Sequence, residues 1–240
     1  MERNEVYVIG EVFLTPLTNV IIPPFSSKVG RTILGDPKDV VVSPLKRNGK
    51  YLIKHSSTPT FLELEAGEVY SFEVGGEEKS VIKELSKLED NYSFFNTYWK
   101  IVDVKLQKVV VNKSKKIRLE ILTPALIVNP YVKAKRKVFT NKSSFVFFVN
   151  LLDVTGFSRN DERTLSLLKH IDEALWEEPS IMKYEKVIYD GKEIIGMTGL
   201  LNYSIEKDSE IVYEILENAI AKGIGSSRRI GFGRVKITVE

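Results

Sequence analysis

The chain has 240 residues, a length that allows one large domain or two small ones. It carries 35 Lys and Arg against 32 Asp and Glu, and 43% of its residues are hydrophobic, enough to form a buried core. Its lack of cysteine excludes disulfides, a thiolate nucleophile and Cys-ligated zinc or iron–sulfur sites, and its 2 histidines exclude a three-His metal centre. We find no signal-peptide pattern and no apolar run near the ~20 residues that span a bilayer, so we expect a cytoplasmic protein without membrane contact.

The formal net charge of +3 hides a strong segregation of charge along the chain. Residues 100–142 carry 12 Lys or Arg and 2 Asp or Glu, whereas residues 143–220 carry 7 and 15. Basic stretches that alternate with acidic ones predict a basic face on an otherwise acidic molecule. Such a face attracts polyanions whatever the total charge, although each stretch taken alone also fits an ordinary solvated surface.

The apolar patterns of the first half predict a strand, a short helix, a hairpin, a helix and a strand. In chain order these elements cover residues 6–14, 26–35, 40–53, 77–88 and 99–111, and the β-rich stretch 61–74 is taken as an elaboration. In the short helix, Ser26 would be the N-cap and Gly35 would end the helix. Lys28 and Arg31 would then lie three residues apart on one helix face.

An Asn48-Gly49 pair in the hairpin is a strong sequence signal for a type I′ turn. This turn would set Arg47 opposite Lys50, and like charges in that arrangement are unfavourable. The pattern therefore indicates either an anion between the two side chains or two cations that point into water.

The second half repeats the same order of elements. The expected strands cover 117–122, 183–189, 194–205 and 235–239, and the expected helices cover 143–152, 162–176 and 209–222. Both halves are thus β-α-β-β-α-β, which is the ferredoxin-like pattern. We predict an α+β protein of two tandem ferredoxin-like (RRM-like) domains with antiparallel sheets, residues 1–115 and 116–240.

A loop rich in glycine and arginine, residues 223–233, separates the last helix from the last strand. Glycines let the backbone approach a ligand closely, and arginines can hold phosphate. Because the loop follows a helix, it meets the negative end of the helix dipole, and it lacks the Gly-Lys-Ser/Thr of a nucleotide-binding P-loop. An ordinary glycine-rich turn is the alternative interpretation.

The pattern Gly223-Ile224-Gly225, five further residues and Gly231-Phe232-Gly233 resembles the glycine-rich loop of the RAMP superfamily, the repeat-associated proteins of CRISPR systems. The run Pro23-Pro24-Phe25-Ser26-Ser27-Lys28-Val29-Gly30-Arg31 resembles the archaeal CRISPR repeat-RNA endoribonucleases, the Cas6 family. In layout the resemblance covers the whole chain. In sequence it covers these stretches together with residues 38–45 and 196–201.

The resemblance implies cleavage of CRISPR repeat RNA without a metal or other cofactor. The ribose 2′-OH attacks the adjacent phosphate and leaves a 2′,3′-cyclic phosphate and a 5′-OH. Many family members use a histidine near the short helix, and this chain has none there. His170 is interpreted as a surface residue, and His55 stays ambiguous.

The resemblance to family members that lack this histidine implies that the catalytic residues are Lys28, Arg31 and Lys38. Arg31 is a departure, because those relatives have lysine there. Arginine stays charged at neutral pH, so proton transfer falls to the lysines, whose neutral forms nearby cations favour. The residues expected to bind RNA are Ser27, Lys46, Arg47, Lys50, Lys54, Lys133, Lys135, Arg136, Lys137, Gly225, Ser226, Ser227, Arg228, Arg229 and Arg234.

Two alternative functions stay open at this level. A non-catalytic RAMP subunit of a CRISPR effector complex would share the fold and the loop without needing the three catalytic cations together. A ferredoxin-like enzyme could instead hold a phosphorylated metabolite in the loop, although the basic segment 131–137 argues against it. The expected partner is CRISPR repeat RNA, and an effector complex and a second copy of the chain are further candidate partners.

Overall fold

The computed structural model describes residues 5–55, 61–133 and 136–240. The chain forms two compact units. Unit 1 consists of Met1–Val109, Lys186–Ile194 and Arg229–Gly231, and unit 2 consists of Val110–Glu185, Ile195–Arg228 and Phe232–Glu240. Unit 1 therefore includes two short segments that are distant in sequence from the rest of it.

The first 109 residues form the main sheet of unit 1 and two helices. Their elements are β1 (Tyr7–Pro16), β2 (Val20–Ile22), α1 (Ser27–Ile33), β3 (Val41–Val42), β4 (Lys46–Arg47), β5 (Lys50–Tyr51), β6 (Leu62–Leu64), β7 (Tyr70–Glu77), α2 (Glu78–Leu85), β8 (Asn91–Phe94) and β9 (Thr97–Lys108). The strand order is β5-β4-β7-β1-β9-β8, with β3 also paired to β7, and β2 pairs with β6 separately. The antiparallel order β3-β7-β1-β9 is ferredoxin-like.

One strand assignment from the sequence was wrong. The hairpin at 40–53 was expected to supply the second and third strands, but β7 is the third strand, and β4 and β5 extend the sheet edge. Burial explains the difference. Tyr70, Phe72 and Val74 of β7 are almost fully buried, whereas the residues of β4 and β5 are half-buried or exposed, so β7 can occupy the centre of the sheet.

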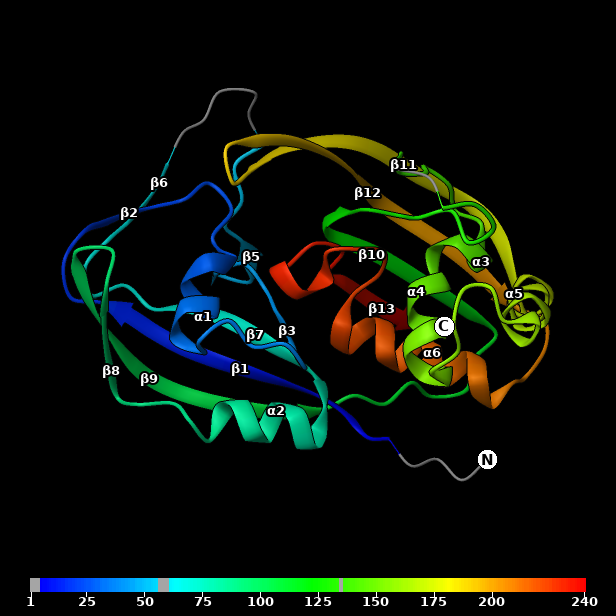
Figure 1. The fold of residues 1–240 in the computed structure, drawn as a ribbon, viewed down its shortest axis with the longest axis horizontal. Helices are drawn as coiled ribbons and strands as arrows, with labels where there is room; N and C mark the ends of the chain where they lie inside the picture. The colour runs from blue at the N-terminus through cyan, green and yellow to red at the C-terminus, as the bar shows by residue number, and fades with distance from the viewer. Residues whose placement is uncertain (1–4, 56–60, 134–135) are drawn as a thin grey trace. The chain divides into compact units, whose positions relative to one another are not determined.

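Both helices of unit 1 pack on one face of its sheet. Gly10 of β1 and Phe72 of β7 lie on that face, because the register pairs Val12 with Phe72. A Cβ at Gly10 would meet Leu85 of α2, which lies alongside β1 (Figure 1), and a Cβ at Gly30 of α1 would meet Phe72. The tight fit at Gly30 fixes α1 against the sheet, so the opposite face of α1 points outward.

The elements after β9 form a second ferredoxin-like sheet. They are β10 (Lys116–Ala125), α3 (Ser143–Val146), α4 (Phe148–Thr155), α5 (Glu162–Ala174), β11 (Leu175–Tyr189), β12 (Lys192–Ile205), α6 (Glu210–Lys222), the 3₁₀ turn η1 (Arg228–Ile230) and β13 (Val235–Val239). The strand order β11-β12-β10-β13 repeats the arrangement of the first sheet. The protein is therefore an α+β protein with two ferredoxin-like domains, as the sequence predicts.

The core of unit 2 lies between its sheet and its helices. Leu119 and Leu201 of the sheet cluster with Phe148, Leu168 and Leu216 of the helices, and all five are buried. The helices α4 and α6 lie side by side in this layer (Figure 1). Within the part of the chain that the structure describes, no helix is both long enough and apolar enough to cross a membrane.

The domain boundary depends on where the connector between the sheets is assigned. The predicted division was residues 1–115 and 116–240, whereas the two compact units divide between Val109 and Val110. Because β9 ends at Lys108 and β10 begins at Lys116, either division leaves both sheets intact. The sequence did not predict that residues 186–194 and 229–231 belong to unit 1.

Candidate functional site

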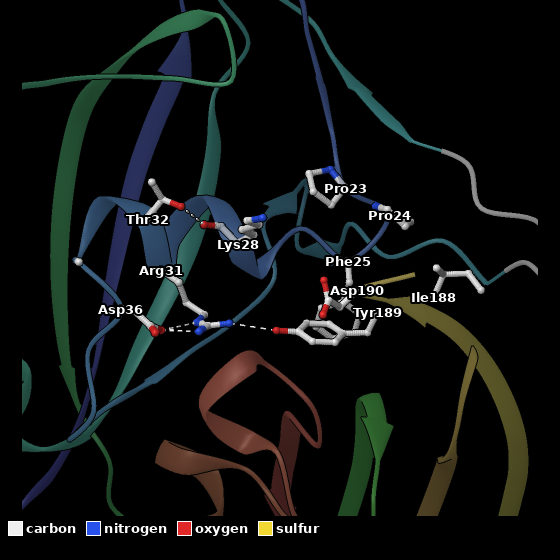
Figure 2. Close-up of a pocket in the computed structure, with 11 residues that line it drawn as sticks. Pro23, Pro24, Phe25, Lys28, Arg31, Thr32, Asp36, Ile188, Tyr189 and Asp190 are labelled. Atoms are coloured by element: carbon white, nitrogen blue, oxygen red, sulfur yellow. Dashed lines mark hydrogen bonds and ion pairs between the residues drawn. The ribbon is translucent and has the colours of Figure 1, made fainter. Parts of the chain in front are cut away.

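A cavity of about 490 Å³ lies beside α1 in unit 1. Its wall comes from α1, from the segments on either side of α1, and from the end of β11 and the turn after it (Figure 2). The lining residues are Pro23, Pro24, Phe25, Lys28, Arg31, Thr32, Gly35, Asp36, Ile188, Tyr189 and Asp190. The wall thus combines two cations, Lys28 and Arg31, with two carboxylates, Asp36 and Asp190, and an apolar part formed by Pro23, Pro24 and Phe25.

The short helix presents its cations to this cavity, as its sequence predicts. Lys28, Arg31 and Thr32 all line the cavity, because residues three and four apart share a helix face. Val29 and Ile33 are buried on the other side. The apolar residues thus anchor α1 and leave its polar face to the cavity.

The C-terminus of α1 forms as the sequence predicts, but the predicted N-cap does not form. At the C-terminus, the Asp36 N–H donates to the Arg31 carbonyl at 2.8 Å and the Gly35 N–H to the Thr32 carbonyl at 3.2 Å, a Schellman arrangement that ends the helix. At the N-terminus, the Ser26 hydroxyl makes no cap hydrogen bond. Its oxygen accepts from the Leu45 N–H at 2.8 Å in place of a helix N–H, and its hydroxyl donates to the Leu52 carbonyl at 2.7 Å.

Arg31 is held in a fixed orientation across the cavity. Its Nε donates to Asp36 Oδ1 at 2.9 Å, its Nη2 also contacts Asp36, and its Nη1 donates to the Tyr189 hydroxyl at 3.0 Å (Figure 2). Burial alone would lower the pKa of Arg31, but the hydrogen bond that Arg31 donates to Asp36 and the neighbouring charges outweigh burial and raise the pKa. Arg31 is therefore a permanent, oriented positive charge.

Tyr189 is a site residue that the sequence did not indicate. It ends β11, and its ring meets the Phe25 ring edge-on, with centroids 5.5 Å apart and an interplanar angle of 82°. The next two residues, Asp190 and Gly191, have φ of +50° and +72° and form the tight turn of the β11–β12 hairpin. The Asp-Gly signal predicts this turn, but sequence spacing does not say where the end of the hairpin lies.

Lys38 is not among the residues that line the cavity. It is exposed and lies between α1 and β3. Hydrogen bonding and charge from Arg31 lower the pKa of Asp36, and Arg229 and Lys38 add smaller contributions of the same sign. The structure thus brings Lys28 and Arg31 together at the cavity and leaves Lys38 outside its wall, near Asp36.

Two cations of the hairpin contact carboxylates of the protein itself. Lys46 Nζ lies 2.7 Å from Glu11 and 2.9 Å from Glu73, and Arg47 lies 3.0 Å from Glu68. Burial opposes the charge of Lys46, but the two glutamates raise its pKa overall. Both cations are therefore already partly neutralised.

The hairpin turn itself forms as predicted. Asn48 and Gly49 have φ of +52° and +75°, and Arg47 pairs with Lys50 across the turn. Arg47 contacts the carboxylates of Glu65 and Glu68, which offsets its positive charge opposite Lys50. Lys50 is exposed and Lys54 is half-buried.

The basic segment 133–137 divides into exposed and half-buried side chains. Lys133 and Arg136 are exposed, and Lys135 lies outside the described residues. Lys137 is half-buried and donates to the Ser226 hydroxyl of the glycine-rich loop at 2.9 Å. Burial lowers the pKa of Lys137.

The glycines of the loop allow close packing of the backbone against itself. Gly225 has a φ of +72°, and a Cβ there would lie 2.7 Å from the Leu126 carbonyl oxygen. Gly233 has a φ of +68°, and a Cβ there would collide with the Ile224 carbonyl. The close approach predicted for a ligand is therefore made, at these two positions, by neighbouring backbone.

The three arginines of the loop differ in exposure. The Arg228 side chain is 11% exposed and lies 2.9 Å from Asp153. Arg234 is 2% exposed, and its Nη1 donates to the Ala221 carbonyl at 2.7 Å. Arg229 is exposed, and its Nη2 donates to the Pro37 carbonyl at 3.2 Å. Among them, Arg229 presents the most accessible guanidinium.

Several other predicted residues are buried or lie outside the cavity wall. Ser27 is fully buried in α1, and Ser227 is exposed with a φ of +60°. His55 is exposed and does not line the cavity, and His170 lies 2.8 Å from the Ser209 hydroxyl. Among the described residues, no three His, Cys, Asp or Glu side chains gather in a way that could hold a metal ion.

A comparison with protein families identifies the N-terminal region. Residues 8–109 match the model of the Cas6 N-terminal domain. This match identifies a Cas6 N-terminal domain in the chain. It contains α1, and with α1 the two cations that face the cavity. None of the curated proteins matches the sequence.

Solved Cas6 structures share the fold of the whole chain. A Cas6-related protein from Pyrococcus furiosus is 16% identical, with a TM-score of 0.62 over 98% of this chain and 99% of its own. Cas6 of Thermus thermophilus is 13% identical, with the same TM-score over 98% and 99%. A structure described as a RAMP protein binding different RNA substrates is 16% identical, with a TM-score of 0.56 over 96% and 99%. At these low identities the comparison shows a shared fold, which consists of the two ferredoxin-like domains of Cas6 proteins.

Proposed function

We propose that this protein is a metal-independent endoribonuclease that cleaves CRISPR repeat RNA and leaves 2′,3′-cyclic phosphate and 5′-OH ends. The observation that carries the proposal is the position of Lys28 and Arg31, which line one cavity from α1 of a Cas6 N-terminal domain. The similar structure described as a RAMP protein binding different RNA substrates supports RNA as the ligand class.

In this proposal the scissile phosphate lies over the polar face of α1. Arg31 stabilises the negative charge that develops on the phosphate as the 2′-oxygen attacks, because its guanidinium is already oriented by Asp36 and Tyr189. We assign to Lys28 the transfer of the proton from the 2′-OH. The apolar wall of Pro23, Pro24 and the Tyr189 ring contacts the ribose and base of the flanking nucleotide.

The RNA outside the cavity is held through its phosphates by cations that are exposed or half-buried. Phosphate contacts position the strand without reading its bases. We assign this role to Lys38, Lys50, Lys54, Lys133, Arg136 and Arg229. We leave out Lys46 and Arg228, because they form ion pairs with carboxylates of the protein, and Arg234, because it is buried.

The decisive experiment incubates the protein with end-labelled repeat RNA from its own CRISPR array in excess EDTA. We expect cleavage to persist, since the nucleophile is the ribose 2′-OH and the charges are supplied by side chains. A single deoxyribose upstream of the cut should abolish it, and the product ends should be a cyclic phosphate and a 5′-OH. Loss of cleavage in EDTA with recovery in Mg²⁺ would overturn the mechanism.

A non-catalytic RNA-binding subunit of an effector complex is the competing function. Two observations favour it: the charge of Arg31 is partly neutralised by Asp36, and neither histidine lines the cavity. Such a subunit would bind the repeat RNA tightly and leave it uncut under every condition above. Binding and cleavage measured on the same RNA therefore separate the two functions, and sedimentation of the same sample tests for a homodimer.

The glycine-rich loop provides a prediction about binding. Arg229→Ala should weaken RNA binding and lower the slope of log affinity against log salt by about one unit or less. Arg228→Ala should act mainly on stability, because it removes the pair with Asp153. Fluorescence anisotropy at several salt concentrations and thermal unfolding of both variants measure the two effects. Unchanged affinity and slope for Arg229→Ala would remove this arginine from the RNA-binding surface.

A further inference from the structure

The second half of β9 is a free edge of the first sheet. On one side β1 pairs with β9 as far as Lys108, whereas on the other side β8 pairs with it only from Thr97 to Lys100. Among the strands that the structure describes, none pairs with this other side of residues 102–108. A free edge of this length presents backbone donors and acceptors that a further strand can bind.

The backbone groups of alternate residues along this edge point away from β1. The Val109 N–H donates to the Tyr7 carbonyl at 2.9 Å, so the backbone of Val109 points toward β1. Because hydrogen-bonded positions alternate along an antiparallel pair, the even-numbered residues from 102 to 108 point their N–H and carbonyl groups outward. The Val104 N–H agrees with this direction, since it donates to Asp103 Oδ1 at 2.8 Å. A side chain of the same strand thus takes the place that a neighbouring strand would fill.

The side chains of the edge alternate between apolar and charged. Val102, Val104 and Leu106 are 51%, 40% and 49% exposed, and they share the face on which the helices pack, because Leu106 pairs with Gly10. The residues between them, Asp103 and Lys105, lie on the opposite face and are exposed. Lys105 Nζ lies 4.0 Å from Asp103 Oδ2, so neither charge has a close partner in the other.

This pattern is complementary to itself when a second copy of the strand runs antiparallel. With Val104 opposite the partner's Val104, the outward backbone groups of the two copies face one another. The same register sets Asp103 opposite the partner's Lys105, and Val102 opposite the partner's Leu106. Opposite charges and apolar side chains directly across two strands stabilise their pairing.

Other registers lack this complementarity. A shift by one residue sets outward backbone groups against inward ones. A shift by two residues sets Lys105 opposite the partner's Lys105, or Asp103 opposite the partner's Asp103, and like charges in that position are unfavourable. The edge therefore specifies one register for a second copy of itself.

We propose that two copies of the chain associate through this edge of β9, with antiparallel strands and Val104 at the twofold axis. The Val104 N–H then donates to the partner's Val104 carbonyl, and Asp103 pairs with the partner's Lys105. The first sheets of the two copies join into one continuous sheet, as strand addition at an open edge allows. This association does not depend on whether the chain cleaves RNA.

The test reverses one charge at a time and measures the mass of the protein in solution. Asp103→Lys sets two lysines opposite one another across the edge, and Lys105→Asp sets two aspartates opposite one another. We expect wild type to be a dimer and each variant alone to be a monomer. An equimolar mixture of the two variants should form a dimer again, because each chain then has the charges that the other lacks. Sedimentation velocity of the full chain, free of nucleic acid and over increasing concentration, measures each sample.

Recovery of the dimer in the mixture supports the inference, since mixing does not repair a general loss of stability. A wild-type protein that stays monomeric at every concentration would overturn it, because the charges would then only protect the edge. A dimer that survives both substitutions would also overturn it, as the interface would lie elsewhere. Variants that are folded by circular dichroism and stay monomeric when mixed would contradict the register.

The matched control is Lys183→Asp. Lys183 is an exposed lysine on β11, the edge strand of the second sheet, and it undergoes the same change of charge away from β9. We expect this variant to sediment as wild type. Loss of the dimer in this variant alone would place the interface on β11 and overturn the assignment to β9.

Discussion

Replacing Arg31 by alanine is expected to slow cleavage of repeat RNA by about a hundredfold or more, the cost of removing an oriented charge-stabilising donor. Arg31 is the side chain whose geometry is most fully determined, since Asp36 and Tyr189 hold its guanidinium from two directions. The fold should survive the change, because the Asp36 side chain is 63% exposed and water can solvate it when Arg31 is gone. The single-turnover rate with saturating enzyme is the measurement, as it separates the chemical step from binding.

The neighbouring lysines define the extent of the site. Lys28→Ala should slow cleavage by about tenfold or more, which corresponds to ~1.4 kcal/mol in the barrier. Lys38→Ala decides whether the site extends beyond the cavity wall: a comparable loss would include Lys38 in catalysis, and a rate near wild type would restrict it to binding. The control is Lys79→Ala on α2, outside the cavity lining. Wild-type rates for both Arg31→Ala and Lys28→Ala would move the active site away from α1.

Replacing Gly233 by alanine is expected to destabilise unit 2 by about 3 kcal/mol or more. A non-glycine residue at a φ of +68° costs about 1–2 kcal/mol. The added Cβ also collides with the Ile224 carbonyl, and backbone that must shift to relieve such overpacking typically costs about another 1–3 kcal/mol. Thermal unfolding followed by circular dichroism should show a midpoint lower by roughly 6–12 °C for a chain of this size.

Gly156→Ala is the matched control for this prediction. Gly156 also has a φ of +68°, but a Cβ there would have nothing within 4 Å. It therefore measures the backbone cost alone, and we expect a loss of about 1 kcal/mol. Equal losses for the two variants would show that the loop backbone moves freely enough to accept a side chain at Gly233.

The local features of α1 were predictable from the sequence because they depend on neighbours in the chain. A spacing of three and four residues sets Lys28, Arg31 and Thr32 on one face of a helix. The buried Val29 and Ile33 on the other face fix which side points outward. Gly35 ends the helix because glycine adopts the left-handed conformation without strain. The Asn48-Gly49 turn follows from the same kind of local rule.

Local sequence patterns could not decide which segment takes the central position beside β1 in the first sheet. Residues 40–53 and 61–77 both have strand-forming sequences, and pairing with β1 decided between them. The strand β7 pairs with β1 from Tyr70 to Glu77 and buries three large side chains, so it took the central position. Likewise, Ser26 does not cap α1 because its oxygen accepts from the N–H of Leu45, which is 19 residues away in the chain.

The sequence by itself determined the two ferredoxin-like domains, the cationic face of α1 and the positions of the turns, because periodicity and turn chemistry act over a few residues. Only the tertiary structure decided which cations remain available to bind a ligand and which already contact carboxylates of the protein. Arg228 contacts Asp153, and Lys46 contacts Glu11 and Glu73. The partners in each pair are more than 26 residues apart in the chain. It also brought Tyr189 to Arg31 across 158 residues, a contact that depends on where a hairpin packs rather than on the residues around it.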